Sequence, residues 1–193
     1  MCIDWSDRYS GEVVKLPIDY SLPFSENVKN ISKWLKAHSQ KNPACYVVMY
    51  HATGKDSPVF EQGLLAGCSK RRTSSISESG YIYLSVNPNY ARGYGKLKFP
   101  DGCVIYEVIV SVKKLLADKL HFYYARPNEL ITSNLVNSLV YGGSARVKGN
   151  IERWQIKQYS EEKPSLLDRI NKKQEVKSGS DLGIKPKKNY ERG

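Results

Sequence analysis

An unbroken run of ten strand-forming residues, CVIYEVIVSV at positions 103–112, constrains the fold more than any other feature. β-branched and aromatic side chains dominate the run, and the turn sequence Pro100-Asp101-Gly102 precedes it. Shorter runs of this kind lie at 44–51 and 81–86, and further strands are expected at 134–141, in SARVKG after Gly142-Gly143, and in IERWQIKQY. Many short strands with few helices predict an α+β domain on a strongly curved, split, mainly antiparallel sheet.

Short helices are expected around these strands. Residues 25–40 place Val28, Ile31 and Leu35 on one helical face. Further short helices are expected from Pro58 to a stop at Gly63, from Asn87-Pro88 towards Gly93 or Gly95, and at 164–174. This pattern divides the chain into an N-terminal helical segment at 1–43, a central domain at 44–160, and a basic C-terminal helix and tail at 161–193.

The chain is strongly basic, with 30 Lys and Arg against 19 Asp and Glu among 193 residues. A formal net charge of +11 favours an acidic partner, such as nucleic acid. No run of about 18 apolar residues is present, so no membrane partner is expected. The N-terminal residues lack a basic region followed by an apolar one, which predicts a cytoplasmic protein.

The four cysteines predict free thiols in a reducing compartment. Cys2, Cys45, Cys68 and Cys103 form no CxxC pair, and their spacings with the three histidines match no zinc pattern. No metal is therefore expected.

Three short motifs follow one another in the central domain. Tyr50-His51-Ala52-Thr53 ends the first strand and is followed by PVFEQGLL. The strand YIYLS carries Tyr83, and Tyr94 follows eleven residues later on a short helix. The third motif is GGSARVKGNI, at positions 142–151.

In this order the motifs resemble the ADP-ribosyltransferase superfamily, in the class that includes diphtheria toxin and the poly-ADP-ribose polymerases. Members carry a YHGT-like strand, a helix leading to a Gly-Leu pair, and a strand Tyr followed by a second Tyr eleven residues later. The resemblance covers roughly residues 44–156 and makes 44–160 the transferase domain. It implies a split antiparallel sheet that holds NAD in a bent form and breaks its nicotinamide–ribose bond.

The resemblance also implies roles for individual residues. His51 would hold a hydroxyl of the adenosine ribose, since a neutral imidazole is both a donor and an acceptor. The backbone of Ala52 would pair with the nicotinamide amide, and the rings of Tyr83 and Tyr94 would sandwich the nicotinamide. The implied cofactor-binding set is Tyr50, His51, Ala52, Thr53, Tyr83, Ser85 and Tyr94.

The sequence departs from the family at the catalytic glutamate. Alignment of the last strand places Ser144 at that position, and a serine supplies no negative charge. Three alternatives stay open: Glu152 or Glu129 supplies the acid; the site works without a glutamate, with Arg146 as the natural counterpart, as in the RNA 2'-phosphotransferase branch; or the site binds NAD without turnover.

A basic loop between the His51 strand and the Tyr83 strand suggests the acceptor. Lys70, Arg71 and Arg72 lie in it, and such a rim suits a phosphate backbone. We therefore expect an ADP-ribosyltransferase that modifies nucleic acid, with single-stranded RNA preferred. A small basic transferase of this kind fits a toxin of a bacterial or phage conflict system, paired with an antitoxin protein. The alternatives are a protein-modifying effector, an RNA 2'-phosphotransferase, and a binding module that has lost catalysis.

Overall fold

A computed structural model describes residues 11–41, 44–67, 78–118 and 134–160. The chain divides into two units between Tyr159 and Ser160, and every element described below belongs to the first. The helix expected at 164–174 lies outside the described residues.

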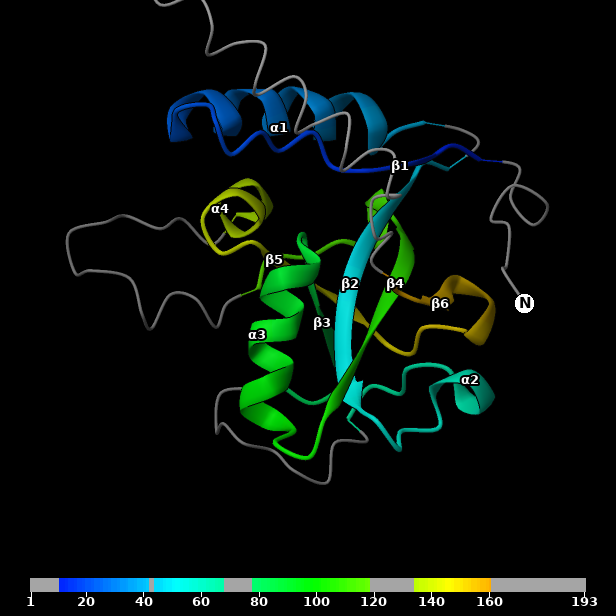
Figure 1. Ribbon diagram of the computed structural model, residues 1–193. Helices are drawn as coiled ribbons and strands as arrows, with labels where there is room; N and C mark the ends of the chain where they lie inside the picture. The colour runs from blue at the N-terminus through cyan, green and yellow to red at the C-terminus, as the bar shows by residue number, and fades with distance from the viewer. Residues whose placement is uncertain (1–10, 42–43, 68–77, 119–133, 161–193) are drawn as a thin grey trace, which may run out of the picture. The chain divides into compact units, whose positions relative to one another are not determined.

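The described residues form one six-stranded sheet with few helices, which confirms the α+β class (Figure 1). The strands are β1 (Val13–Val14), β2 (Tyr46–Gly54), β3 (Tyr81–Ser85), β4 (Cys103–Ser111), β5 (Ser144–Lys148) and β6 (Ile156–Gln158). Their order is β5-β3-β2-β4-β6 with antiparallel neighbours, and β1 pairs with β2 in parallel. The strand expected from 103 is thus the neighbour of the central strand.

The two edges of β2 differ sharply. Along one edge β4 pairs with it from Tyr46↔Ser111 to Gly54↔Cys103, without a break. Along the other edge β3 pairs with it only at Tyr50↔Ser85. Because backbone pairing stops there, β3 diverges from β2, and we call the space between them beyond Tyr50 the β2–β3 gap.

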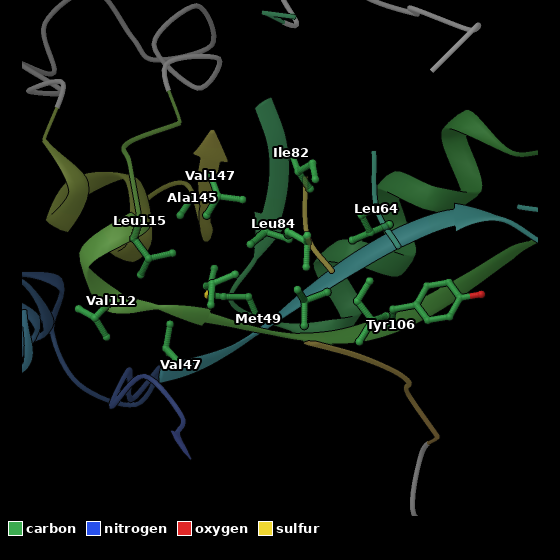
Figure 2. Packing of buried hydrophobic residues seen from close by; sticks show 14 of the residues in the cluster. Val47, Met49, Leu64, Ile82, Leu84, Tyr106, Val112, Leu115, Ala145 and Val147 are labelled. Carbon is green, nitrogen blue, oxygen red and sulfur yellow. The ribbon is translucent and has the colours of Figure 1, made fainter. Parts of the chain in front are cut away.

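The main hydrophobic core lies between the two halves of this bent sheet. Figure 2 shows Ile82 and Leu84 of β3 and Ala145 and Val147 of β5 facing side chains of β2 and β4. Met49, Val47 and Val108 at its centre are fully buried. Ile31, from the helix before β2, and Leu139, from the helix before β5, close the same core.

Within the described residues, four α-helices and two short 3₁₀ helices accompany the sheet: α1 (Phe24–His38), α2 (Val59–Gln62), α3 (Pro88–Lys98), α4 (Leu135–Val140), η2 (Val112–Lys114) and η4 (Arg153–Gln155). The helices predicted from 25, 58 and 87 are confirmed. Helix α3 packs on β2 and β4, where Ala91 joins a second small core with Tyr50, Ala52 and Ile105 (Figure 1).

The strand expected at 134–141 is wrong, because Leu135–Val140 is helix α4. The Asn134 side chain accepts a hydrogen bond from the Asn137 amide at 2.8 Å and so caps the helix. Leu139 packs in the core from this helix, four residues after Leu135. The cap and this helical spacing outweigh the strand preference of the β-branched Val136 and Val140.

The helix that starts at Pro88 was expected to run only to Gly93 or Gly95. Helix α3 instead continues to Lys98. Gly95 lies against the sheet, where a Cβ atom would come within 2.8 Å of both the Ala52 Cβ and the Cys103 Sγ. The glycine therefore permits close packing of the helix on β2 instead of ending the helix. This contact fixes α3 beside the strand that carries His51.

The last segment, IERWQIKQY, contributes less strand than expected. Only Ile156–Gln158 pair with β4, and Arg153–Gln155 form η4.

In the described part of the chain, none of the helices combines the length and the apolar character that a membrane crossing requires.

Candidate active site

His51 bridges the β2–β3 gap. Its Nδ1 lies 2.8 Å from the carbonyl oxygen of Tyr83, one residue beyond the last β2–β3 pair. A carbonyl only accepts, so Nδ1 carries the proton and Nε2 of the neutral ring keeps its lone pair. Burial lowers the pKa of His51 below its ordinary value, and the positive charge of Lys98 adds to that effect. His51 is therefore a neutral imidazole whose Nε2 lone pair can act as a hydrogen-bond acceptor.

The backbone of Ala52 lies on the edge of β2 that faces this gap. The Tyr46 amide donates to Glu12 next to β1, while the Cys45 carbonyl accepts from Val112 at the end of β4. Backbone groups alternate between the two edges of a strand, so even-numbered residues of β2 face β1 and β3. The amide and carbonyl of Ala52 thus point to the edge where β3 has diverged. The resemblance implies that they pair with a planar amide.

Tyr94 lies on α3 near the same gap. The Lys98 ammonium is 4.6 Å from the centre of its ring, and the same ammonium is close enough to His51 to lower its pKa. The Tyr94 ring is half exposed. Among the described residues the rings of Tyr83 and Tyr94 make no contact with each other, and the sandwich that the resemblance implies stays a prediction.

Tyr83 belongs to a polar cluster with Arg146. The two residues are paired across β3 and β5, and the Tyr83 hydroxyl accepts from the Glu78 amide at 3.1 Å. The buried Arg146 guanidinium donates to the Glu78 carboxylate at 2.7 Å and stacks on Tyr81 at 4.2 Å.

Burial opposes the charge of Arg146, yet hydrogen bonds to Glu78 and Tyr83 raise the pKa of the guanidinium above its ordinary value. Its Nε is buried and has no partner among the described residues. Arg146 is therefore a fixed cation on the β5 neighbour of Tyr83, held by a carboxylate whose side chain is 46% exposed.

Tyr50, Ser85 and Ser144 stand in one row across β2, β3 and β5. The Ser144 hydroxyl donates to the carboxylate of Asp118 at 2.9 Å. Leu116 bridges Arg146 on the far edge of β5, and the antiparallel register continues this row to Asp118. Ser144, which stands where the family has its glutamate, is thus hydrogen-bonded to the carboxylate of Asp118 from another segment.

Asp118 is a site candidate that sequence reasoning missed. It is buried, and its amide donates to the Ser138 hydroxyl, which donates in turn to the Ser144 carbonyl. A buried carboxylate in a hydrogen-bonded network is a candidate for function. The only signal in the sequence was an acid following the apolar pair Leu115-Leu116, and that is too common to single it out.

Glu152 has a structural position. It is exposed at the start of η4, where its side chain and that of Gln155 form a capping box. The neighbouring Ile151 pairs with Leu64, so the turn is joined to the segment after α2 and not to β3.

The remaining predicted residues fall into two groups. Tyr50 and Thr53 are buried in β2, where burial raises the pKa of Tyr50 to about 12 and its ring meets Tyr159 edge-on at 5.4 Å. Tyr50 thus packs against Tyr159, and its predicted contact with NAD stays a prediction. Glu129, Lys70, Arg71 and Arg72 lie outside the described residues.

One group of side chains away from the gap has the composition of a metal site. Ligand atoms of Glu12, His38 and Cys45 lie within 4.8 Å of one another. The Glu12 carboxylate already accepts from Lys41 at 2.8 Å, and the Nδ1 of His38 bonds to the Trp34 carbonyl oxygen. Burial raises the pKa of the Cys45 thiol, which opposes the thiolate that a metal requires. The Glu12 carboxylate is therefore already engaged in an ion pair with Lys41.

In comparisons with known proteins, no family model matches the chain, and neither a curated protein nor a solved structure matches it.

Proposed function

We propose that the chain is an NAD-dependent mono-ADP-ribosyltransferase whose NAD site is the β2–β3 gap. One observation carries the proposal: beyond Tyr50, β2 presents to this gap both a neutral His51 imidazole with an acceptor Nε2 and the backbone of Ala52. These are the two contacts that the family resemblance requires at a YHGT-like strand.

The groups around the gap match the parts of NAD. A ribose hydroxyl donates to the Nε2 of His51, and the carboxamide pairs with the amide and carbonyl of Ala52. Tyr94 already attracts a cation, since the Lys98 ammonium sits over its ring. The nicotinamide of oxidised NAD is itself a cationic ring, so it replaces Lys98 over the same aromatic face.

The chemistry needs a negative charge near the ribose. As the C1'–N bond to nicotinamide breaks, the bonding electrons leave with nicotinamide and positive charge develops on the ribose ring. Ser144 accepts a hydrogen bond from a ribose hydroxyl while donating its own proton to Asp118. Asp118 thereby supplies, through Ser144, the charge that the family's glutamate supplies directly.

The proposed acceptor is nucleic acid. A nucleophilic atom of the acceptor attacks C1' and releases its proton to solvent, so the products are ADP-ribosylated acceptor, nicotinamide and a proton. The net charge of +11 supports a polyanionic acceptor. The biological role that fits is a toxin of a bacterial or phage conflict system, restrained by an antitoxin protein.

Incubation with NAD labelled in the adenylate phosphate tests this proposal. Separate pools of RNA, DNA and cell protein are supplied, and label transfer and nicotinamide release are measured for the wild type and for His51→Ala. We expect label in nucleic acid, with RNA preferred, and none with His51→Ala. Label found only in protein would show that the acceptor is a protein and not nucleic acid. If no nicotinamide is released in any pool, the proposed transferase activity is contradicted.

A further inference from the structure

We infer that a hollow on the far flank of α3 binds one nucleotide of a single-stranded acceptor. The hollow has a volume of about 350 Å³ and lies between the second half of α3 and the start of β4. Its lining includes Arg92, Lys96, Phe99, Cys103 and Ile105. None of the residues expected to hold NAD lines it. The inference rests on the proposed transferase, because it names where that enzyme holds its acceptor.

Helix α3 separates this hollow from the β2–β3 gap. Ala91 and Gly95 face the sheet, while Arg92, Lys96 and Phe99 follow one another at intervals of four and three residues along one flank. Tyr94 and Lys98 are also four residues apart, and they lie on the flank close to His51. One helix thus presents a site on each side, with the hollow about one helix diameter, roughly 10 Å, from the gap.

The charge of α3 favours a phosphate. Arg92, Lys96 and Lys98 are the charged residues of Pro88–Lys98, and the helix contains no acid. Arg92 donates to the neutral Asn89 side chain at 2.9 Å, a bond that orients the guanidinium. The next acid along the chain, Asp101, lies in the following turn and is not among the lining residues.

The apolar lining favours a base over a peptide carboxylate. Phe99 gives the hollow an aromatic side chain, and Pro100 and Ile105 add apolar surface. Stacking of a base on an aromatic ring contributes about 1–3 kcal/mol and is available only to an unpaired base. A lining of two cations and one aromatic ring therefore fits a base with its phosphate, and a volume of this size lies at the lower end of small-ligand sites.

A charge-matched pair of variants tests the inference by binding. Arg92→Ala with Lys96→Ala removes two cations from the hollow, and Lys29→Ala with Lys33→Ala removes two exposed cations from α1. Binding of fluorescein-labelled single-stranded RNA and DNA is followed by anisotropy from low to high salt. If Arg92 and Lys96 each neutralise one of the two phosphates that flank the bound nucleotide in the strand, the slope of log affinity against log salt flattens by about 1.4 in the hollow variant. An equal change in both variants overturns the inference.

Alkylation of Cys103 gives a second readout inside the hollow. In protein carrying Cys2→Ser and Cys68→Ser, the remaining thiols are the buried Cys45 and the partly exposed Cys103. We expect a single-stranded oligonucleotide to slow the reaction of Cys103 with iodoacetamide at least tenfold, and a duplex to have little effect. Protection by an acidic peptide instead assigns the hollow to a protein acceptor and contradicts the inference.

These tests separate the hollow from the NAD site. Hydrolysis of NAD without acceptor is measured on the same variants, and Arg92→Ala with Lys96→Ala should leave it unchanged. If the wild type releases no nicotinamide but a single-stranded oligonucleotide still protects Cys103, the proposed transferase activity is contradicted and nucleotide binding in the hollow is supported. If nicotinamide is released but Cys103 is not protected, nucleotide binding in the hollow is contradicted and the transferase activity is supported.

Discussion

The two edges of β2 show how one strand serves both stability and chemistry. Towards β4 it pairs along its whole length, and its Val47 and Met49 fill the core. Towards β3 it pairs once, and the His51 side chain then replaces the missing backbone contacts. Where a ladder continues, backbone groups satisfy one another, and where it stops they are available to a ligand. The first edge holds the sheet together, and the second holds the proposed site.

Substitution at the core face of β2 is expected to have the largest effect on folding. Met49→Ala leaves a cavity in a fully buried position and should lower the free energy of unfolding by about 2–5 kcal/mol. Urea unfolding followed by tryptophan fluorescence measures this loss. NAD hydrolysis per folded molecule should stay within about twofold, and a large loss of it in folded protein contradicts the division between the two edges.

Removal of the negative charge behind Ser144 should strongly reduce turnover while NAD still binds. Asp118→Asn keeps the shape of the side chain and its contact with Ser144 but removes the negative charge. We expect nicotinamide release to fall about 100-fold, in the range found for single stabilising groups in active sites. NAD affinity should change little. Ser138→Ala, which removes a neighbour in the same network, is the control. Equal turnover losses in both variants indicate a structural network instead.

The depressed pKa of His51 predicts a pH effect with a definite sign. Below about pH 6.5 the unfolded chain takes up a proton at this histidine, while the folded protein keeps it neutral until lower pH. The unfolded state then binds more protons, so the free energy of unfolding falls on acidification. The stability difference between the wild type and His51→Ala should therefore shrink between pH 7.5 and 5.5, as urea unfolding can measure. A difference that grows on acidification contradicts a neutral His51.

The smallest effect is expected at Tyr94. Tyr94→Phe keeps the aromatic face that meets Lys98 and should leave the KM for NAD within about twofold. Tyr94→Leu removes the face and should raise KM at least fivefold, with kcat less affected. Since the side chain is half exposed, neither change should alter the unfolding midpoint appreciably. A KM raised equally by Phe and Leu assigns the role to the hydroxyl and not to stacking.

Local patterns predicted much of the fold but less of the site. The strand from 103 and the helix from 25 carry long, regular signals, and both lie where expected. The prediction for residues 134–141 was wrong because their β-branched side chains suggested a strand, whereas the Asn134 cap and the burial of Leu139 favour a helix. The contact of His51 with Tyr83 spans 32 residues, and that of Ser144 with Asp118 spans 26. Such pairings depend on sheet register, which no local pattern encodes.

Calorimetric titration of NAD into the wild type and His51→Ala tests the central claim most directly. His51→Ala removes one partly buried hydrogen bond and should cost only about 1 kcal/mol of stability, so the variant stays folded. The wild type should bind one NAD per chain, and the variant should bind it at least tenfold more weakly at equal folded content. Equal NAD affinity in the two proteins would contradict the assignment of the β2–β3 gap as the NAD site.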